Sequence, residues 1–235
     1  MTGGLASTGM TGLRFDTYDW NGGSEAMLRF GPDTGPIVIA ALPLFEEANR
    51  TRQFLVTILR ALAAKGIGSV LPDFPGTGES IVVTCEARLH DQREAYTALA
   101  QQLGSRTYAI SIRSGALLDT QATLAGRWQL APQTGAELLR DLERTRNAAT
   151  RTTPAADREY AGNILCSDML ADLREATAYA GEGPMRIARL DTDPRPADVA
   201  HPGSPLWRRS EPGNDIVFAQ RLAIDIAQCM ASCES

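Results

Sequence analysis

The fold of this 235-residue chain is decided by one stretch, Thr107-Tyr-Ala-Ile-Ser-Ile-Arg-Ser-Gly-Ala-Leu-Leu118. Its first six residues are mostly apolar, which predicts a strand that is buried on both faces. The small residues Ser114 and Gly115 then allow a sharp turn, and the residues after them are apolar and favour a helix. A strand, a tight turn and a helix in this order predict that the side chain of Arg113 is raised above the edge of a sheet.

The same kind of turn carries the nucleophile of α/β-hydrolases, where it reads G-x-S-x-G. In this chain the five residues are Ser111-Ile-Arg-Ser-Gly115, so arginine takes the place of the nucleophilic serine. A guanidinium stays protonated at physiological pH and has no lone pair with which to attack a carbonyl group. It can bind an anion or pair with a carboxylate. The sequence therefore predicts a hydrolase scaffold that lacks the usual nucleophile.

Strand and helix patterns alternate along the rest of the chain. We expect strands at 13–18 and 26–30, which could form an antiparallel pair, and at 36–42, 67–71, 107–112, 127–131 and 185–190. We expect helices at 51–65, 91–103, 134–150, 167–179 and 214–230, and one directly after Arg113. This alternation predicts an α/β fold like that of the α/β-hydrolases, a mostly parallel sheet with helices on both faces and a small insert or lid. We expect a flexible N-terminus at 1–12 and a single domain at 13–235, with the insert at about 149–183.

Composition narrows the possible partners. The net charge of -5 and the pI of about 5.2 argue against nucleic-acid binding. No run of 18 apolar residues is present, so no membrane span is expected, and the first twenty residues hold no apolar run of signal-peptide length. We therefore expect a cytoplasmic protein. No cofactor motif is complete, and none of the four cysteines forms a C-x-x-C pair, so we expect neither a cofactor nor a metal. The oligomeric state stays open.

Two loops should lie beside Arg113 at the carboxyl edge of the sheet, where open α/β sheets bind their ligands. One is Pro43-Leu-Phe-Glu-Glu-Ala-Asn-Arg-Thr-Arg52, and the other is the glycine-rich Asp73-Phe-Pro-Gly-Thr-Gly-Glu-Ser80. A buried arginine is costly unless it is paired, so we expect Glu46 or Glu47 to neutralise Arg113. The simpler alternative is a solvated loop whose acidic residues favour the start of a helix. The candidate residues for binding an anionic or acyl small molecule are Arg113, Glu46, Glu47, Arg52 and Asp73.

Both loops also resemble a known family. Residues 43–52 and 73–80, together with 112–118, 128–132 and 205–211, are similar to the exosortase A system-associated hydrolase 2 family, and the likeness extends over about residues 25–225. The resemblance implies an α/β-hydrolase fold, a hydrolase name and a place beside bacterial exopolysaccharide and protein-sorting genes. It also implies arginine at the turn. The chain departs from the family at Leu42, where the family tends to have histidine.

A catalytic triad could survive elsewhere, as Ser114, His201 and Asp191 in an active serine esterase or thioesterase. Ser114 directly follows the raised position, and His201 follows the acidic residues after the last long strand. The loop that usually supplies the histidine is Glu211-Pro-Gly-Asn-Asp215 and contains no imidazole. A serine nucleophile needs a base within hydrogen-bonding distance, so His201 could act only if its loop folds back over the turn. A third hypothesis is a purely structural partner protein, which is favoured if ion pairs of Arg113 fill the crevice.

Overall fold

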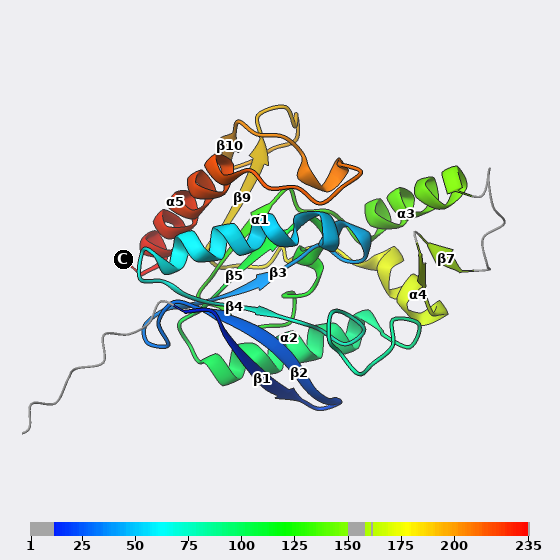
Figure 1. Ribbon diagram of the computed structural model, residues 1–235, viewed down its shortest axis with the longest axis horizontal. Helices are drawn as coiled ribbons and strands as arrows, with labels where there is room; N and C mark the ends of the chain where they lie inside the picture. The colour runs from blue at the N-terminus through cyan, green and yellow to red at the C-terminus, as the bar shows by residue number, and fades with distance from the viewer. Residues whose placement is uncertain (1–11, 150–157, 161, 235) are drawn as a thin grey trace, which may run out of the picture.

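The computed structural model describes residues 12–149, 158–160 and 162–234, and an eight-stranded sheet forms the centre of this part of the chain (Figure 1). The strand order is β1-β2-β4-β3-β5-β6-β9-β10. The strands are β1 (Arg14–Trp20), β2 (Gly23–Phe30), β3 (Ile37–Ala41), β4 (Gly68–Pro72), β5 (Thr107–Ile112), β6 (Gly126–Leu130), β9 (Met185–Leu190) and β10 (Val199–His201). β1, β2 and β4 pair antiparallel, whereas the pairs from β4 through β10 are parallel. The expected leading antiparallel pair and the mostly parallel sheet are confirmed.

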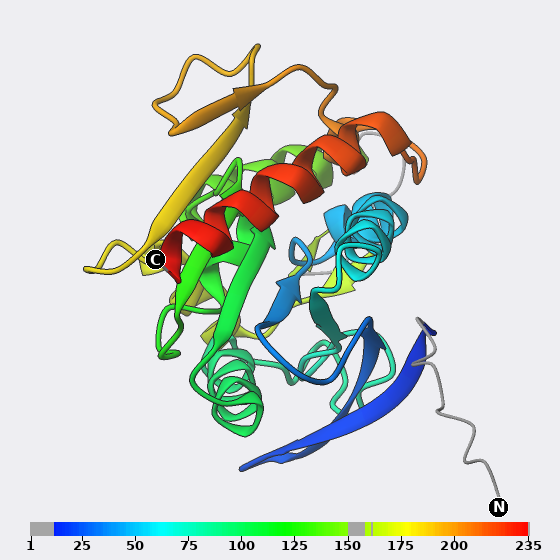
Figure 2. The same cartoon turned by 90° about the vertical axis from the view of Figure 1, so that its left-hand side faces the viewer.

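Helices cover both faces of the sheet. They are α1 (Glu46–Ala63), α2 (Leu89–Leu103), α3 (Gly135–Ala149), α4 (Ser167–Glu175) and α5 (Ile216–Cys233). α1 and α5 lie side by side on one face, and α2 lies on the other (Figures 1 and 2). Strand β3 is buried throughout because its residues alternate between the two cores: Ile37, Ile39 and Ala41 pack in one, Val38 and Ala40 in the other.

The structure corrects one expectation at the central turn. The helix expected after Arg113 is only the 3-10 helix η1 (Arg113–Leu117). The connection from β5 to β6 spans residues 113–125, and a crossover between parallel strands usually needs a dozen or more residues. No length is left for a long helix, so the turn carries little helix dipole.

The sequence analysis also failed to predict several short elements near the insert. The segment between β6 and β9 contains α3, a two-stranded hairpin of β7 (Glu159–Tyr160) and β8 (Asn163–Ile164), and α4, which packs against α3. The expected insert at 149–183 lies partly outside the described residues, as does most of the expected flexible N-terminus at 1–12. β10 and the 3-10 helix η2 (Leu206–Arg208) were not expected either.

α5 is, in the described ranges, the one helix long and apolar enough to cross a membrane by length and composition. It packs along α1, and Phe218 of α5 stacks on Phe54 of α1 with ring centroids 5.2 Å apart. Eight residues of α5 are buried in this arrangement. Its apolar character is therefore explained by its place in the core.

Candidate functional site

Arg113 lies at the turn where the sequence places it. Its backbone has φ 55°, a left-handed conformation that is strained for a side chain of this size, and its side chain is only 7% exposed. Gly115 completes the turn, because a Cβ atom there would lie 2.6 Å from the carbonyl oxygen of Ala41. Strand, strained residue and glycine together form the elbow geometry that raises one side chain over the sheet edge.

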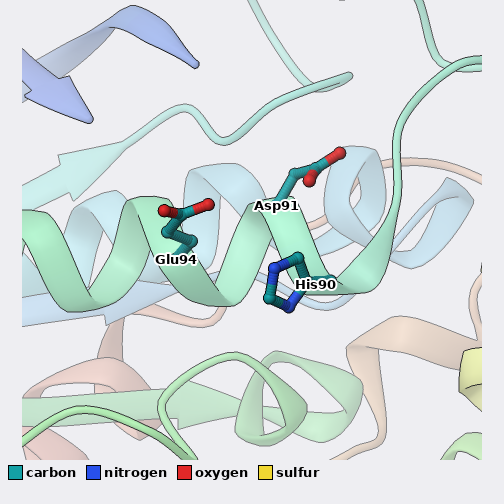
Figure 3. A group of neighbouring side chains, drawn as sticks. All are labelled: His90, Asp91 and Glu94. Carbon is teal, nitrogen blue, oxygen red and sulfur yellow. The ribbon is translucent and has the colours of Figure 1, made fainter. Parts of the chain in front are cut away.

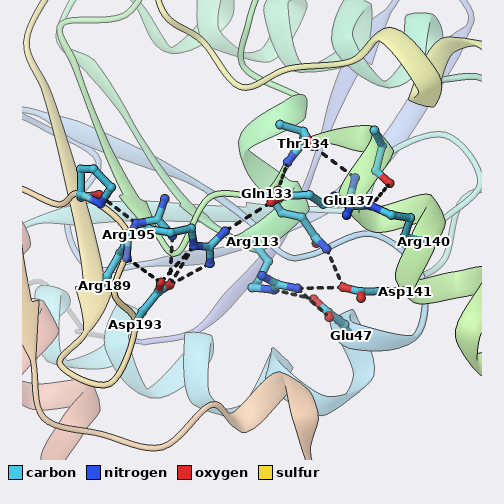
Figure 4. Close-up of polar contacts among 12 residues, drawn as sticks. Glu47, Arg113, Gln133, Thr134, Glu137, Arg140, Asp141, Arg189, Asp193 and Arg195 are labelled. Carbon is cyan, nitrogen blue, oxygen red and sulfur yellow. Dashed lines mark hydrogen bonds and ion pairs between the residues drawn. The ribbon is translucent and has the colours of Figure 1, made fainter.

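The guanidinium of Arg113 faces two carboxylates, those of Glu47 and Asp141 (Figure 4). Its Nε donates to Glu47 Oε2 at 3.2 Å and its Nη2 to Asp141 Oδ2, also at 3.2 Å. Gln133 Nε2 donates to the same Asp141 oxygen at 2.7 Å, and the guanidinium stands 5.4 Å from the ring centroid of Trp207. The expected ion pair between Arg113 and Glu47 is therefore present.

Burial raises the pKa of Glu47, and the charge of Arg113 opposes that rise. The pair is thus a desolvated one, in which each charge depends on the other. Glu46, the other expected partner, instead pairs with Arg50 one turn further along α1. Of the two acidic residues at the start of α1, Glu47 therefore pairs with Arg113 and Glu46 pairs with Arg50 of the same helix.

A cavity of about 470 Å³ opens above Arg113, and we call it the Arg113 crevice. Its charged lining consists of five arginines (Arg113, Arg140, Arg144, Arg195 and Arg208) and three carboxylates (Glu137, Asp141 and Asp193), a net charge of +2. It lies beyond the carboxyl ends of β5, β6 and β9, where α/β sheets bind ligands. The hydrogen bond from Arg195, with help from Arg189, holds the pKa of Asp193 well below its usual range (Figure 4).

Ser114 has a structural partner in place of a catalytic one. It is fully buried, and its Oγ accepts a hydrogen bond of 2.9 Å from the backbone N–H of Leu44. That N–H is also the donor that an oxyanion hole would need from this loop, since Pro43 has none. The hydroxyl of Ser114 therefore already binds the Leu44 N–H, one of the two donors that would stabilise a tetrahedral intermediate.

His201 is likewise engaged elsewhere. Its Nε2 lies 3.4 Å from Asp225 Oδ2 of α5, and the same carboxylate accepts from Trp128 Nε1 at 2.7 Å and from Arg186 Nη1 at 2.6 Å. Asp191 is exposed and meets His201 through the backbone, donating its N–H to the histidine carbonyl. Within the described residues no side-chain hydrogen bond or ion pair joins Ser114, His201 and Asp191, so the triad considered from the sequence is not assembled.

Arg52 and Asp73 form a pair of their own, with Arg52 Nη1 3.6 Å from Asp73 Oδ1. They do not line the Arg113 crevice but a second cavity beside it. Of the candidate ligand-binding residues, the structure thus brings Arg113 and Glu47 together and sets Arg52 and Asp73 apart. Asp141, Gln133 and Trp207 were missed, because their sequence positions carry no local signal of a shared site.

One side-chain group could be compared with a metal site. The ligand atoms of His90, Asp91 and Glu94 lie within 4.8 Å of one another at the start of α2 (Figure 3). All three residues are exposed or half-exposed and come from a single helix, and exposed acidic groups are common without an ion. The cysteines are free, and Cys166 accepts a hydrogen bond from the N–H of Met169 at the start of α4. We assign no metal site to either group.

Comparison with solved structures shows the α/β-hydrolase fold. A putative hydrolase from Agrobacterium vitis S4 aligns over 93% of this chain and 98% of its own, with a TM-score of 0.57 and 15% identity. Epoxide hydrolase VrEH1 from Vigna radiata aligns over 50% of this chain and 40% of its own (TM-score 0.41, 18% identity). Epoxide Hydrolase A from Mycobacterium thermoresistibile aligns over 51% and 39% (TM-score 0.43, 21% identity).

The chain thus spans about two fifths of the length of these two epoxide hydrolases. No protein-family model matches the chain, and no curated protein matches it. Likeness at this level of identity shows the fold alone, because one fold hosts many unrelated functions.

Proposed function

We propose that this chain is a non-hydrolytic, ligand-binding protein of the α/β-hydrolase fold, which takes a small anionic ligand or the carboxylate of an acyl compound in the Arg113 crevice. In this proposal it acts in the bacterial cytoplasm beside an exosortase and exopolysaccharide system, the context that the family resemblance implies. One observation carries the binding role: the raised residue of the elbow is a buried arginine that opens onto a cavity lined by four further arginines.

The charge of the crevice favours an anion. Asp193 is already paired with Arg189 and Arg195, and Asp141 is shared between Arg113 and Arg144. Arg208, by contrast, is exposed, and its guanidinium has no hydrogen bond or ion pair in the described part of the chain. A carboxylate or phosphate group matches the fork of a guanidinium and would gain charge-assisted hydrogen bonds there.

A structural partner protein is the second candidate. The ion pairs of Arg113 with Glu47 and Asp141 favour it, because they neutralise the raised charge without any ligand. The open volume of the crevice favours ligand binding instead, since ion pairs that served structure alone would not require an arginine-lined cavity. A binding experiment separates the two.

The purified protein is expected not to turn over p-nitrophenyl acetate. The raised position has no hydroxyl, Ser114 is bound to the Leu44 N–H, and His201 pairs with Asp225. The rate of nitrophenol release should equal the uncatalysed rate and be the same in Ser114→Ala and His201→Ala. Rapid turnover that both substitutions abolish would instead establish a serine esterase.

Inorganic phosphate and octanoate are expected to bind in the Arg113 crevice. Arg208→Gln and Arg140→Gln each remove one positive charge from the lining and leave no described carboxylate without a partner, so each should weaken binding of phosphate several-fold. Isothermal titration calorimetry at low salt measures the change. Arg60→Gln is the matched control, because Arg60 is an exposed arginine of α1 that does not line the crevice. Equal affinities in all three variants, or no binding at all, would favour the structural partner.

A further inference from the structure

Strand β1 forms one edge of the sheet, and its outer side pairs with no other strand of the described residues. β1 (dark blue) lies at the outer margin of the molecule, in a hairpin with β2 that extends away from the rest of the sheet (Figures 1 and 2). The other edge, β10, has only three residues, whereas β1 has seven. An open edge of this length presents N–H and C=O groups with which another strand can pair.

The hydrogen bonds of β2 decide which residues of β1 face outward. The C=O of Ala26 in β2 accepts from Asp73 N–H at 2.8 Å, directly after β4. The even-numbered residues of β2 therefore bond towards β4, and the odd-numbered ones, such as Met27, bond towards β1. Met27 lies opposite Asp16, and the direction of bonding alternates along a strand. Phe15, next to Asp16, thus directs its N–H and C=O groups outward.

Phe15 is the open point of this edge. Its outward backbone groups have no partner in the described part of the chain, and its side chain is 83% exposed. The next outward donor, Thr17 N–H, bonds to Asp16 Oδ1 at 2.9 Å. Natural edges are often protected by a charge or a proline, and the position of Phe15 has neither.

The two neighbours of Phe15 carry opposite charges. Arg14 and Asp16 lie on the face opposite to that of Phe15, because side chains alternate along a strand. Within the chain Arg14 pairs with Asp33, and Asp16 pairs with Arg29. The side chains of Arg14 and Asp16 are still 46% and 47% exposed, so a second chain can reach both.

We propose that two copies of this chain pair through their β1 strands, antiparallel about a two-fold axis at Phe15. Phe15 then lies opposite the partner's Phe15, and Leu13 lies opposite the partner's Thr17. Arg14 lies opposite the partner's Asp16, and this contact occurs twice. Positions 14 and 16 form non-hydrogen-bonded pairs, in which facing side chains are closest, and unlike charges in such pairs stabilise a sheet.

Neighbouring registers do not join unlike charges. A pair centred on Asp16 places the two Asp16 carboxylates opposite each other, where they repel. A pair centred on Thr17 places Asp16 opposite Tyr18, and Arg14 opposite Trp20. The charges therefore select the register at Phe15. A two-fold contact of this kind is closed, so pairing stops at the dimer.

The dimer should be weak. One pair of strands with a single aromatic contact buries less surface than a standard protein interface, so the fraction of dimer should depend on concentration. The charge pairs contribute mainly to specificity. β1 shares no residue with the lining of the Arg113 crevice, so this inference does not depend on the ligand proposed there.

Sedimentation velocity of the full-length protein, over a concentration series into the millimolar range, tests the pairing. The mean mass should rise from 25.3 kDa towards twice that value. Phe15→Ala should lower the association constant several-fold, and because the side chain is exposed it should not disturb the fold. The matched control is Ile81→Ala, which removes a side chain that is 86% exposed and lies outside β1, and which should leave association unchanged.

Two charge reversals test the register. Arg14→Asp and Asp16→Arg each place like charges at both contacts, so each should lower the association constant by about tenfold or more. In an equimolar mixture of the two variants, the new aspartate of one lies opposite the new arginine of the other. Asp16 of the first then lies opposite Arg14 of the second. The mixture should therefore dimerise as wild type does, although neither variant does so alone.

The mixture also separates this pairing from an unrelated interface, whose loss by either reversal would not be rescued. A wild type that stays monomeric over the whole series would overturn the proposal. So would a dimer that neither charge reversal weakens, or variants that lose dimerisation and do not regain it on mixing.

Discussion

Replacing Arg113 with serine is expected to lower the free energy of unfolding by about 3–5 kcal/mol and to create no esterase. The loss follows from Glu47, whose side chain is only 15% exposed and would keep its charge without its partner. Asp141 would also lose the guanidinium, although Gln133 still donates to it. Urea denaturation measures the change in stability, and a p-nitrophenyl ester assay on the same sample measures activity.

The cost of Arg113→Ser should depend on pH. Burial already raises the pKa of Glu47, and removal of Arg113 removes the charge that opposes the rise. A carboxyl group with a raised pKa binds its proton more tightly in the folded state, so the variant loses stability as pH rises above the usual glutamate range near 4.3. The difference from wild type should therefore be larger at pH 8 than at pH 5. The double variant Arg113→Ser, Glu47→Gln should recover part of the loss at pH 8.

A serine at position 113 would still lack the rest of a catalytic site. His201 is held by Asp225, the Leu44 N–H is held by Ser114, and the short η1 supplies little dipole. Residues of a triad act as a unit, so one restored member gains little. Unchanged stability together with new ester turnover would contradict this account and show that Arg113 blocks an otherwise complete active site.

The sequence predicted those features that depend on local pattern. The apolar run of β3 and the strand–turn–helix order at Arg113 follow from side-chain periodicity and glycine placement. The pair of Arg113 with Glu47 was also within reach, because the loops after two adjacent parallel strands meet at one edge of the sheet and a buried arginine needs a carboxylate.

Other features depend on how distant segments pack. Asp141 lies on α3 and Trp207 on η2. The sequence around either residue does not predict a contact with Arg113. The sequence also allowed His201 to lie over the turn at Arg113, because the loop around His201 has no periodic pattern that would fix its position. Its actual partner, Asp225, is one polar residue on the buried face of α5. The length of η1 was misjudged because the apolar run favoured a helix, whereas the short connection to β6 leaves no room for one.

Replacing Arg127 with leucine is expected to lower the free energy of unfolding as much as Arg113→Ser does, although Arg127 lies outside the proposed site. Its Nε stands 3.2 Å from Asp119 Oδ2, and the two side chains are 5% and 1% exposed. Its Nη2 donates to the carbonyl oxygens of Asp119 and Ala122, and its guanidinium lies 3.6 Å from the ring centroid of Tyr179. One side chain thus joins β6, the turn after η1 and the segment after α4.

The contribution of the pair Arg127 and Asp119 to the stability of the fold depends on pH in a defined direction. Burial raises the pKa of Asp119 to about 6, and Arg127 opposes that rise. Because the folded state then binds the proton more tightly than the unfolded chain, Asp119 lowers stability progressively from about pH 4, the usual aspartate pKa, to about 6. Without Arg127 the pKa should rise further, so the window of loss should extend to higher pH.

Arg127→Leu should therefore lower the free energy of unfolding by about 3–5 kcal/mol at pH 8 and by less at pH 5, where Asp119 can take up a proton. The matched control is Arg106→Leu, which breaks the ion pair with Glu234 at a side chain that is 55% exposed and should change stability very little, because solvent screens exposed charges. Leucine at both 119 and 127 should restore much of the loss, because a buried pair can be replaced by apolar groups but not halved. Urea denaturation at pH 5 and pH 8 compares wild type, Arg127→Leu, Arg106→Leu and the double leucine variant. If Arg127→Leu lowers the free energy of unfolding no more than Arg106→Leu does, the buried pair does not hold these segments together.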